Sequence, residues 1–135
     1  MAADAGDVDR VSRAAAIAFN EAINQRNLDA LRKLMTDGHA FIDADDNVVA
    51  GKAAVLNAWK GFFSAFPDYR NDWSQVMATH GRHVALGRSV CSTEPALEGP
   101  AIWTVRTAGD KVSEWRVYAD TPANRVQLEI ANESD

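Results

Sequence analysis

Two carboxylates are the first candidates for chemistry in this sequence. Asp43 follows the short strand-like stretch of residues 39–42, and Asp120 ends the strand-like segment of residues 112–120. Burial raises the pKa of a carboxyl group, which makes its carboxylate a stronger base toward an activated C–H proton. We therefore predict acid/base roles for both aspartates. The structural alternatives are that Asp43 only starts the turn at residues 45–47, and that Asp120 caps a strand end or lies on the surface.

Large aromatic side chains would surround these carboxylates. We expect them to form the core and, because core and pocket are continuous, part of a pocket wall: Trp59, Phe62, Phe63, Trp103 and Trp115. Tyr69 and Tyr118 are candidates to donate a hydrogen bond to a substrate oxygen. Their structural alternative is a hydrogen bond to a backbone carbonyl, which buried tyrosines commonly make.

Arg88 is the candidate cation of the site. It lies in a predicted strand with Val84, Leu86 and Val90 on its own face. A guanidinium there would hold a substrate carboxylate or an enolate. The alternative, which we favour, is an ion pair with Glu114 or another acid across the sheet.

Other kinds of site lack the residue patterns that they need. The single cysteine, Cys91, excludes an intrachain disulfide and a zinc site built on cysteines. We expect His39 near the surface at the start of a strand, and His80 and His83 in solvent beside a turn glycine, so no metal site is predicted. The sequence contains no glycine-rich phosphate loop and no dinucleotide fingerprint, and no cofactor is therefore expected.

The composition is that of one globular domain. The chain has 135 residues, of which 47% are apolar, enough for a core. A net charge of −5 without a basic cluster argues against a nucleic-acid partner. No apolar run reaches transmembrane length, and the N-terminus carries Asp4 and Asp7 where an export signal carries Lys or Arg. We expect a cytoplasmic protein with no membrane partner, a single domain over residues 1–135 and a core over about 8–121.

Three helices are predicted in the first half of the chain. Apolar residues at helical spacing indicate helices over residues 8–25, 28–35 and 52–65. Gly38 is expected to end the second helix as a left-handed cap. A short strand over residues 39–43 stands between the second and third helices.

The second half of the chain is predicted to be β. Hairpins join strands over residues 69–79, 84–93, 101–107 and 112–120, and residues 122–130 form one helical turn or lie along the surface. Helices that segregate from an antiparallel sheet define the α+β class. A sheet that curls around its helices encloses an apolar cavity open at one end, which is a common place for a small-molecule site.

Several short motifs occur in a recognisable order along roughly residues 10–121. They occupy residues 19–22 and 27–31, 41–43, 51–55, 66–69, 109–112 and 118–120. In this order the chain resembles the nuclear-transport-factor-2-like superfamily, in particular its SnoaL-like members, which include polyketide cyclases and related isomerases, dehydratases and epoxide hydrolases. The resemblance implies a cystatin-like, cone-shaped α+β barrel, with a curved antiparallel or mixed sheet wrapped around N-terminal helices, and often a homodimer packed through the sheet.

The resemblance also assigns positions one at a time. Ketosteroid isomerases carry a general-base carboxylate where Asp43 stands, but Phe19 replaces their oxyanion-hole tyrosine. Limonene-type epoxide hydrolases carry a catalytic aspartate where Val117 stands. SnoaL-like cyclases use an aspartate near the end of the last strand, for which Asp120 is the nearest equivalent. The comparison further implies that the strand face with Trp115 and Val117 points inward.

Two hypotheses of different class follow. The first is a cofactor-independent acid/base enzyme, a cyclase, isomerase or dehydratase, that acts on a small apolar oxygenated molecule. The second is a non-catalytic small-molecule-binding or dimerisation module of the same fold. An open cavity with a buried aspartate would favour the first, and a cavity packed solid with both carboxylates outside would favour the second. The residues expected to bind the substrate are Phe19, Trp59, Phe63, Tyr69, Arg88, Trp103, Trp115, Val117 and Tyr118.

Overall fold

The computed structural model describes residues 5–79 and 81–130. The elements in chain order are α1 (Ala5–Asn24), α2 (Leu28–Leu34), β1 (Met35–Ile42), β2 (Val48–Ala50), α3 (Lys52–Ala65), β3 (Arg70–Thr79), β4 (Arg82–Val90), a 3-10 helix η1 (Pro95–Leu97), β5 (Gly99–Ala108), β6 (Lys111–Ala119) and α4 (Pro122–Gln127). The predicted turn residue His80 lies outside the described residues. No described helix is long and apolar enough to cross a membrane.

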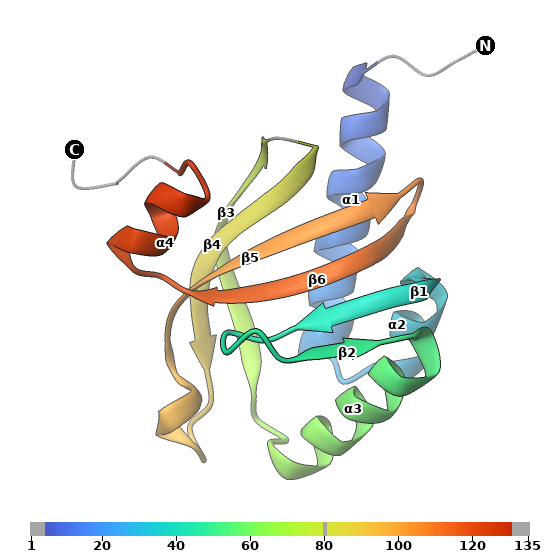
Figure 1. Ribbon diagram of the computed structural model, residues 1–135. Coiled ribbons are helices and arrows are strands. Elements are labelled where there is room, and N and C mark those ends of the chain that lie inside the picture. Colours follow the sequence, from blue (N-terminus) through green and yellow to red (C-terminus); the bar gives the residue numbers. More distant parts are fainter. Residues whose placement is uncertain (1–4, 80, 131–135) are drawn as a thin grey trace.

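The six strands form one open mixed sheet in the order β2-β1-β6-β5-β4-β3. β1 runs parallel to β6, and the other neighbouring pairs are antiparallel. In Figure 1 the helices α1, α2 and α3 lie to the right of and below the curved sheet, whereas α4 lies apart from them at the left. The predicted α+β fold, with a mixed sheet curved around N-terminal helices, is confirmed.

The start of β1 differs from the prediction. We expected the second helix to end at Gly38 and a strand to begin at residue 39, but the chain is already extended at Met35 and pairs there with Val112 of β6. The side chain of Met35 is 1% exposed, so its burial in the core favours the strand over a last helical turn. Gly38 therefore lies inside the strand, where the register of β1 against β6 shifts between Met35 and Ala40.

The segment between β1 and α3 is a hairpin that the sequence indicated only in part. The turn at residues 45–47 was predicted, but the short strand β2 that follows it was not. The third helix has the predicted bounds, Lys52–Ala65. Gly51 precedes it at φ +96°, a backbone conformation that glycine adopts without strain.

The two faces of the sheet carry separate apolar clusters. The inner cluster joins α1, α2 and α3 to inward side chains such as Trp103 and Trp115, which are fully buried. The outer cluster places Leu128 and Ile130, which follow α4, on the opposite face of the sheet, against Val84, Leu86 and Ile102, with Met77 and Tyr118 at its border. The prediction that Trp115 and Val117 point inward is confirmed, because both belong to the inner cluster.

Candidate functional site

A cavity of about 530 Å³ lies between α3 and the inner face of the sheet. Its walls are mainly apolar and aromatic, and its exposed lining residues belong to α3, to residues 43–45, to residues 96–100 at the start of β5, and to the end of β6. We call residues 43–45 and 96–100 the mouth. The remaining lining residues are Phe41, Val49, Val55, Ala58, Trp59, Phe62, Tyr69, Asn71, Ser89, Ala101, Trp103, Trp115, Val117, Tyr118 and Ala119.

The walls are held in place by ring-to-ring packing. Trp59 of α3 meets Phe41 of β1 edge-on at 5.4 Å between ring centroids, and Phe62 meets Tyr69 edge-on at 4.8 Å. Such pairs are favourable because the positive edge of one ring meets the negative face of the other. The cavity is therefore bounded by rings with fixed neighbours, and its size is that of a small-molecule site.

Asp43 lies at the mouth, but its carboxylate is occupied. Oδ1 accepts hydrogen bonds from the backbone N–H groups of Asp45 (2.8 Å) and Asn47 (2.9 Å), and Oδ2 accepts one from the Asn47 side chain (3.1 Å). Slight desolvation opposes these hydrogen bonds but does not outweigh them, so the pKa of Asp43 lies below its ordinary value. The raised pKa that we expected from burial is wrong for this residue, and the turn-starting alternative describes its contacts.

Asp120 does not line the cavity. Its carboxylate accepts two hydrogen bonds from Arg125 of α4, at 2.7 and 2.8 Å. The side chains of this ion pair are only 15% and 11% exposed. The hydrogen bonds from Arg125 hold the pKa of Asp120 below its ordinary value, against the effect of burial. Asp120 therefore attaches α4 to the end of β6, which is its strand-end alternative.

Tyr69 and Asn71 bring polar atoms to the cavity wall. Tyr69 precedes β3, and burial raises the pKa of its phenol to about 12, with the nearby Cys91 adding to the shift. The phenol is therefore a proton-bearing donor at neutral pH. Asn71 is 2% exposed, and its Oδ1 has no hydrogen-bond partner.

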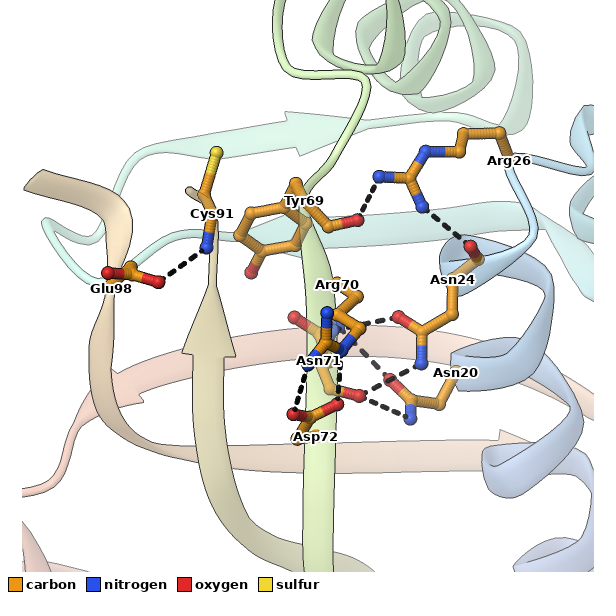
Figure 2. Close-up of polar contacts among 9 residues, drawn as sticks. All are labelled: Asn20, Asn24, Arg26, Tyr69, Arg70, Asn71, Asp72, Cys91 and Glu98. Carbon is orange, nitrogen blue, oxygen red and sulfur yellow. Dashed lines mark hydrogen bonds and ion pairs between the residues drawn. The ribbon is translucent and has the colours of Figure 1, made fainter. Parts of the chain in front are cut away.

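Two asparagines of α1 hold Asn71 in place (Figure 2). Asn24 forms a pair of hydrogen bonds with the Asn71 main chain, accepting from its N–H at 2.8 Å and donating to its carbonyl at 2.9 Å. Nδ2 of Asn71 donates to Oδ1 of Asn20 at 3.1 Å. Arg26 donates to the main-chain oxygen of Tyr69 on the side away from the tyrosine ring. These contacts fix the start of β3 against the end of α1.

The mouth loop at residues 96–100 is anchored by polar contacts of its own. Glu98 accepts a hydrogen bond from the backbone N–H of Cys91 at 3.1 Å, and the Ser89 hydroxyl donates to the carbonyl of Leu97 at 2.5 Å. Asp68 accepts hydrogen bonds from Ser92 and from the backbone and hydroxyl of Thr93, which hold its pKa well below the ordinary value. The chain on both sides of the cavity entrance is thus tied to the sheet.

The other predicted substrate-binding residues divide into two groups. Trp59, Trp103, Trp115 and Val117 line the cavity. Phe19 and Phe63 are buried in the core beside it, where Phe19 stacks on Trp115 at 4.7 Å and Phe63 stacks on Trp59 at 5.5 Å.

Tyr118 and Arg88 lie differently from what we expected. Tyr118 borders the cavity, but its ring packs with the outer cluster. The guanidinium carbon of Arg116 lies over this ring, 4.8 Å from its centroid. Arg88 is exposed and does not line the cavity, because alternation along β4 puts it on the outer face of the sheet with Val84 and Leu86. The expectation that Arg88 holds a substrate in the pocket does not fit this placement.

Two histidines are more buried than the sequence indicated. His39 is fully buried against Phe19, and its Nδ1 lies 2.8 Å from the carbonyl of Val112. His83 is 4% exposed, with its Nε2 3.4 Å from Asp9. Burial lowers the pKa of both imidazoles. Within residues 5–79 and 81–130, no three side chains of the kinds that bind metals come together.

The sequence did not indicate Asn71 or Glu98 as site residues. Asn71 depends on Asn20 and Asn24, which are 51 and 47 residues away in the chain. Glu98 belongs to a loop whose only signals were prolines and a glycine. One signal was present for Asn71, because it stands two residues after Tyr69 and so lies on the same face of the strand.

Comparisons with known proteins agree with this architecture. The family model described as a SnoaL-like domain matches residues 16–120. A proposed SnoaL-like polyketide cyclase from Jannaschia sp. CCS1 superposes with a TM-score of 0.73 at 17% identity, covering 96% of this chain and 97% of its own. An NTF2-like protein of unknown function from Mesorhizobium loti gives 0.71 at 14% identity, covering 90% and 98%. An uncharacterised cystatin-fold protein from Novosphingobium aromaticivorans gives 0.66 at 17% identity, covering 76% and 93%. No curated protein sequence matches the chain significantly.

Proposed function

This chain belongs to the SnoaL-like domain family, and from this membership we propose that its cavity binds a small apolar, oxygenated molecule and catalyses proton transfer on it without a cofactor. The observation that carries the proposal is a cavity of about 530 Å³ in which a protonated tyrosine lines the wall and carboxylates line the mouth. The apolar walls favour an apolar ligand because its binding removes hydrocarbon surface from water.

The donors on the wall suit a carbonyl oxygen. Tyr69 keeps its proton because its pKa is about 12. The indole nitrogens of Trp59 and Trp115 are buried and without partners, so each leaves an N–H group to be satisfied. Hydrogen-bond donors in a low-dielectric cavity stabilise the negative charge that develops on a carbonyl oxygen when a neighbouring C–H bond loses its proton.

Asp43 is the predicted base at the mouth. With its pKa below the ordinary value, its carboxylate is ionised at neutral pH. It would take the proton from the carbon next to the carbonyl, leaving an enolate held by the wall donors. In isomerisation the proton returns at another carbon of the enolate. In cyclisation the enolate carbon bonds to a carbonyl carbon of the same molecule, whose oxygen takes the proton, and in dehydration the enolate expels a β-hydroxyl, which leaves as water with the proton. Three of the similar structures are described as proposed polyketide cyclases, which makes cyclisation the first reaction to examine.

A specific observation favours the non-catalytic alternative as the second candidate. Both aspartates that we expected to act as acid or base make structural hydrogen bonds, Asp43 within its turn and Asp120 with Arg125. A domain that only stores or carries its ligand needs the cavity and not the carboxylates. The homodimer packed through the sheet and the cytoplasmic setting stay predictions.

Deuterium exchange separates the two candidates. Cyclic aryl ketones such as 2-tetralone are incubated in D₂O with the protein, and loss of the α-proton signal is followed by NMR. We expect enzyme-dependent exchange that falls about a hundredfold to a thousandfold in Tyr69→Phe, the range for loss of one oxyanion donor, and that also falls in Asp43→Asn. The exposed Asp110→Asn serves as the control. Exchange no faster than in buffer, together with measurable ketone binding, would leave the non-catalytic binding module.

A further inference from the structure

The charges that line the cavity are all of one sign. Among the described lining residues, Asp43, Asp45 and Glu98 are carboxylates, and none is Lys, Arg or His. All three stand at the mouth, and Asp45 and Glu98 are exposed. A ligand that enters must pass these carboxylates, whose potential extends over roughly one Debye length, about 8 Å at physiological salt.

Three cations near the mouth are held by hydrogen bonds. A fourth, Arg88, lies opposite Pro100, but its side chain is on the outer face of the sheet. Arg70 is close enough to Glu98 to feel its charge, but its guanidinium makes two hydrogen bonds to Asp72, at 2.9 and 3.2 Å. Arg116 pairs with Asp46 at 2.5 Å. Arg26 binds the main chain of Tyr69 on the side away from the ring (Figure 2). The mouth therefore keeps a net negative charge.

A second and independent feature also favours a hydrogen-bond donor on the ligand. Asn71 is 98% buried, lines the cavity and has an unpartnered Oδ1. Neighbouring hydrogen bonds decide which atom of the Asn71 side-chain amide is the oxygen. Asn20 donates from Nδ2 to the main-chain carbonyl of Asn71 at 3.4 Å. The other amide atom of Asn20, Oδ1, therefore accepts, and its donor is Asn71 Nδ2. The unpartnered atom is therefore an acceptor. A buried acceptor without a partner is costly, and a ligand N–H or O–H that reaches it removes that cost.

We propose that the cavity selects an apolar amine in its protonated form and discriminates against carboxylates. This inference rests on the proposed function and narrows its substrate class to oxygenated molecules that carry an ammonium group. The ammonium lies at the mouth, between the carboxylates of Asp45 and Glu98. The aromatic rings behind it add attraction, because a cation near the face of Trp, Tyr or Phe is drawn to the ring quadrupole. The indole N–H groups of Trp59 and Trp115 then remain for the neutral oxygen of the ligand.

A matched ligand series tests the proposal by calorimetric titration. The probes share a naphthalene body: 2-(1-naphthyl)ethylamine, 2-(1-naphthyl)ethanol and 1-naphthylacetate. We expect affinity to fall in that order, with the amine bound about tenfold or more tightly than the acid at low salt, and with a smaller ratio at 0.5 M salt because exposed charges are screened.

The variant Asp45→Asn/Glu98→Gln removes two mouth charges and keeps the turn that Asp43 stabilises. In this variant we expect the preference for the amine over the acid to shrink to about threefold or less, while the alcohol binds as before. Asp110→Asn, which removes an exposed carboxylate away from the cavity, is the matched control and should keep the wild-type ratio.

The outcomes separate the two proposals. If the alcohol binds in the cavity and the acid binds as tightly as the amine, the charge selection is overturned and the proposed small-molecule function stands. If none of the three probes binds, the cavity is no ligand site and both proposals fail. An amine preference that persists unchanged in Asp45→Asn/Glu98→Gln would also overturn the role of the mouth.

Discussion

Two helices cover the same face of the sheet with opposite results. Where α1 crosses β6 the packing is close: Phe19 is fully buried and stacks on Trp115 at 4.7 Å, and Ala15 and Ala16 are almost or fully buried. Between α3 and the sheet, by contrast, a cavity of about 530 Å³ remains. We call these two parts the filled half and the open half.

The difference follows from side-chain size and partner choice. Alanines on the inward face of α1 allow its backbone to approach the strands closely, so one ring fills the remaining space. On α3, Trp59 packs against Phe62 at 5.8 Å and Phe63 at 5.5 Å, so the rings of the helix support one another. Trp59 also meets Phe41 of β1, but much of the ring surface of α3 is used in contacts within the helix, which leaves room for a ligand.

The largest expected effect compares one phenylalanine from each half. Phe19→Ala removes a fully buried ring and should cost about 3–5 kcal/mol of the free energy of unfolding. Phe62→Ala, at the half-buried edge of the open half, should cost only about 1–2 kcal/mol, because the ring already borders empty space. Urea unfolding measures both.

Equal losses for the two variants would contradict the division into a filled and an open half. If Phe19→Ala does not fold, Phe19→Leu keeps the comparison measurable, because it removes less volume from the same position. Its loss should still exceed that of Phe62→Leu.

The sequence predicted the open half well where local signals agree with the fold. The third helix has the predicted bounds because an apolar stripe is flanked by Gly51 and Pro67, and these signals act within a few residues. Six of the nine predicted ligand residues line the cavity. Trp103, Trp115 and Val117 were predictable because side chains alternate between the two faces along β5 and β6, which is a local property. The boundary between the end of the second helix and the start of β1 was less predictable. Gly38 has the composition of a helix cap, and only burial of Met35 decides for the strand.

The polar part of the site could not be predicted from spacing. Asp43 was expected to be a base with a raised pKa, but Asn47 and Asp45 make its carboxylate a turn acceptor. Asn71 matters because α1, far away in sequence, satisfies every group of this residue except its Oδ1. Hydrogen-bond satisfaction is a property of the folded chain, and composition alone does not reveal which polar atom is left over.

The second prediction fills the open half. Val117→Trp places an indole into the cavity from the inner face of β6. We expect binding of 2-(1-naphthyl)ethylamine to weaken by roughly a hundredfold, about 2.7 kcal/mol, while the free energy of unfolding changes little because existing space is used. Val126→Trp adds the same ring to α4, at a position that is 78% exposed, and should leave binding unchanged. Wild-type affinity in Val117→Trp would show that the ligand binds elsewhere.

The third prediction concerns the outer face, where α4 is attached by Asp120 and Arg125. Because the folded-state pKa of Asp120 is lowered, its carboxylate stabilises the fold above the unfolded pKa of about 3.9, and this stability is lost as the pH falls through the lower folded value. Asp120→Asn should therefore cost about 1.5–2 kcal/mol at pH 7. The difference from the wild type should shrink as the pH falls below the unfolded pKa of about 3.9, and a difference independent of pH would contradict the ion pair.

The smallest expected effect returns to the wall of the open half. Tyr69→Phe removes a hydroxyl from a largely buried ring and should change the free energy of unfolding by only a few tenths of a kcal/mol, although it lowers proton exchange strongly.

The titration of the Tyr69 phenol can be followed by absorbance at 295 nm, because the chain has only two tyrosines. The titration step near pH 12 should disappear in Tyr69→Phe and remain in Tyr118→Phe. Because the folded pKa is raised, stability is fully present below about pH 10 and declines between pH 10 and 12, as the unfolded phenol ionises first. A Tyr69 phenol that titrates near pH 10 would mean that water fills the cavity around it, and the wall donor would then lack the dry surroundings on which its use for an enolate depends.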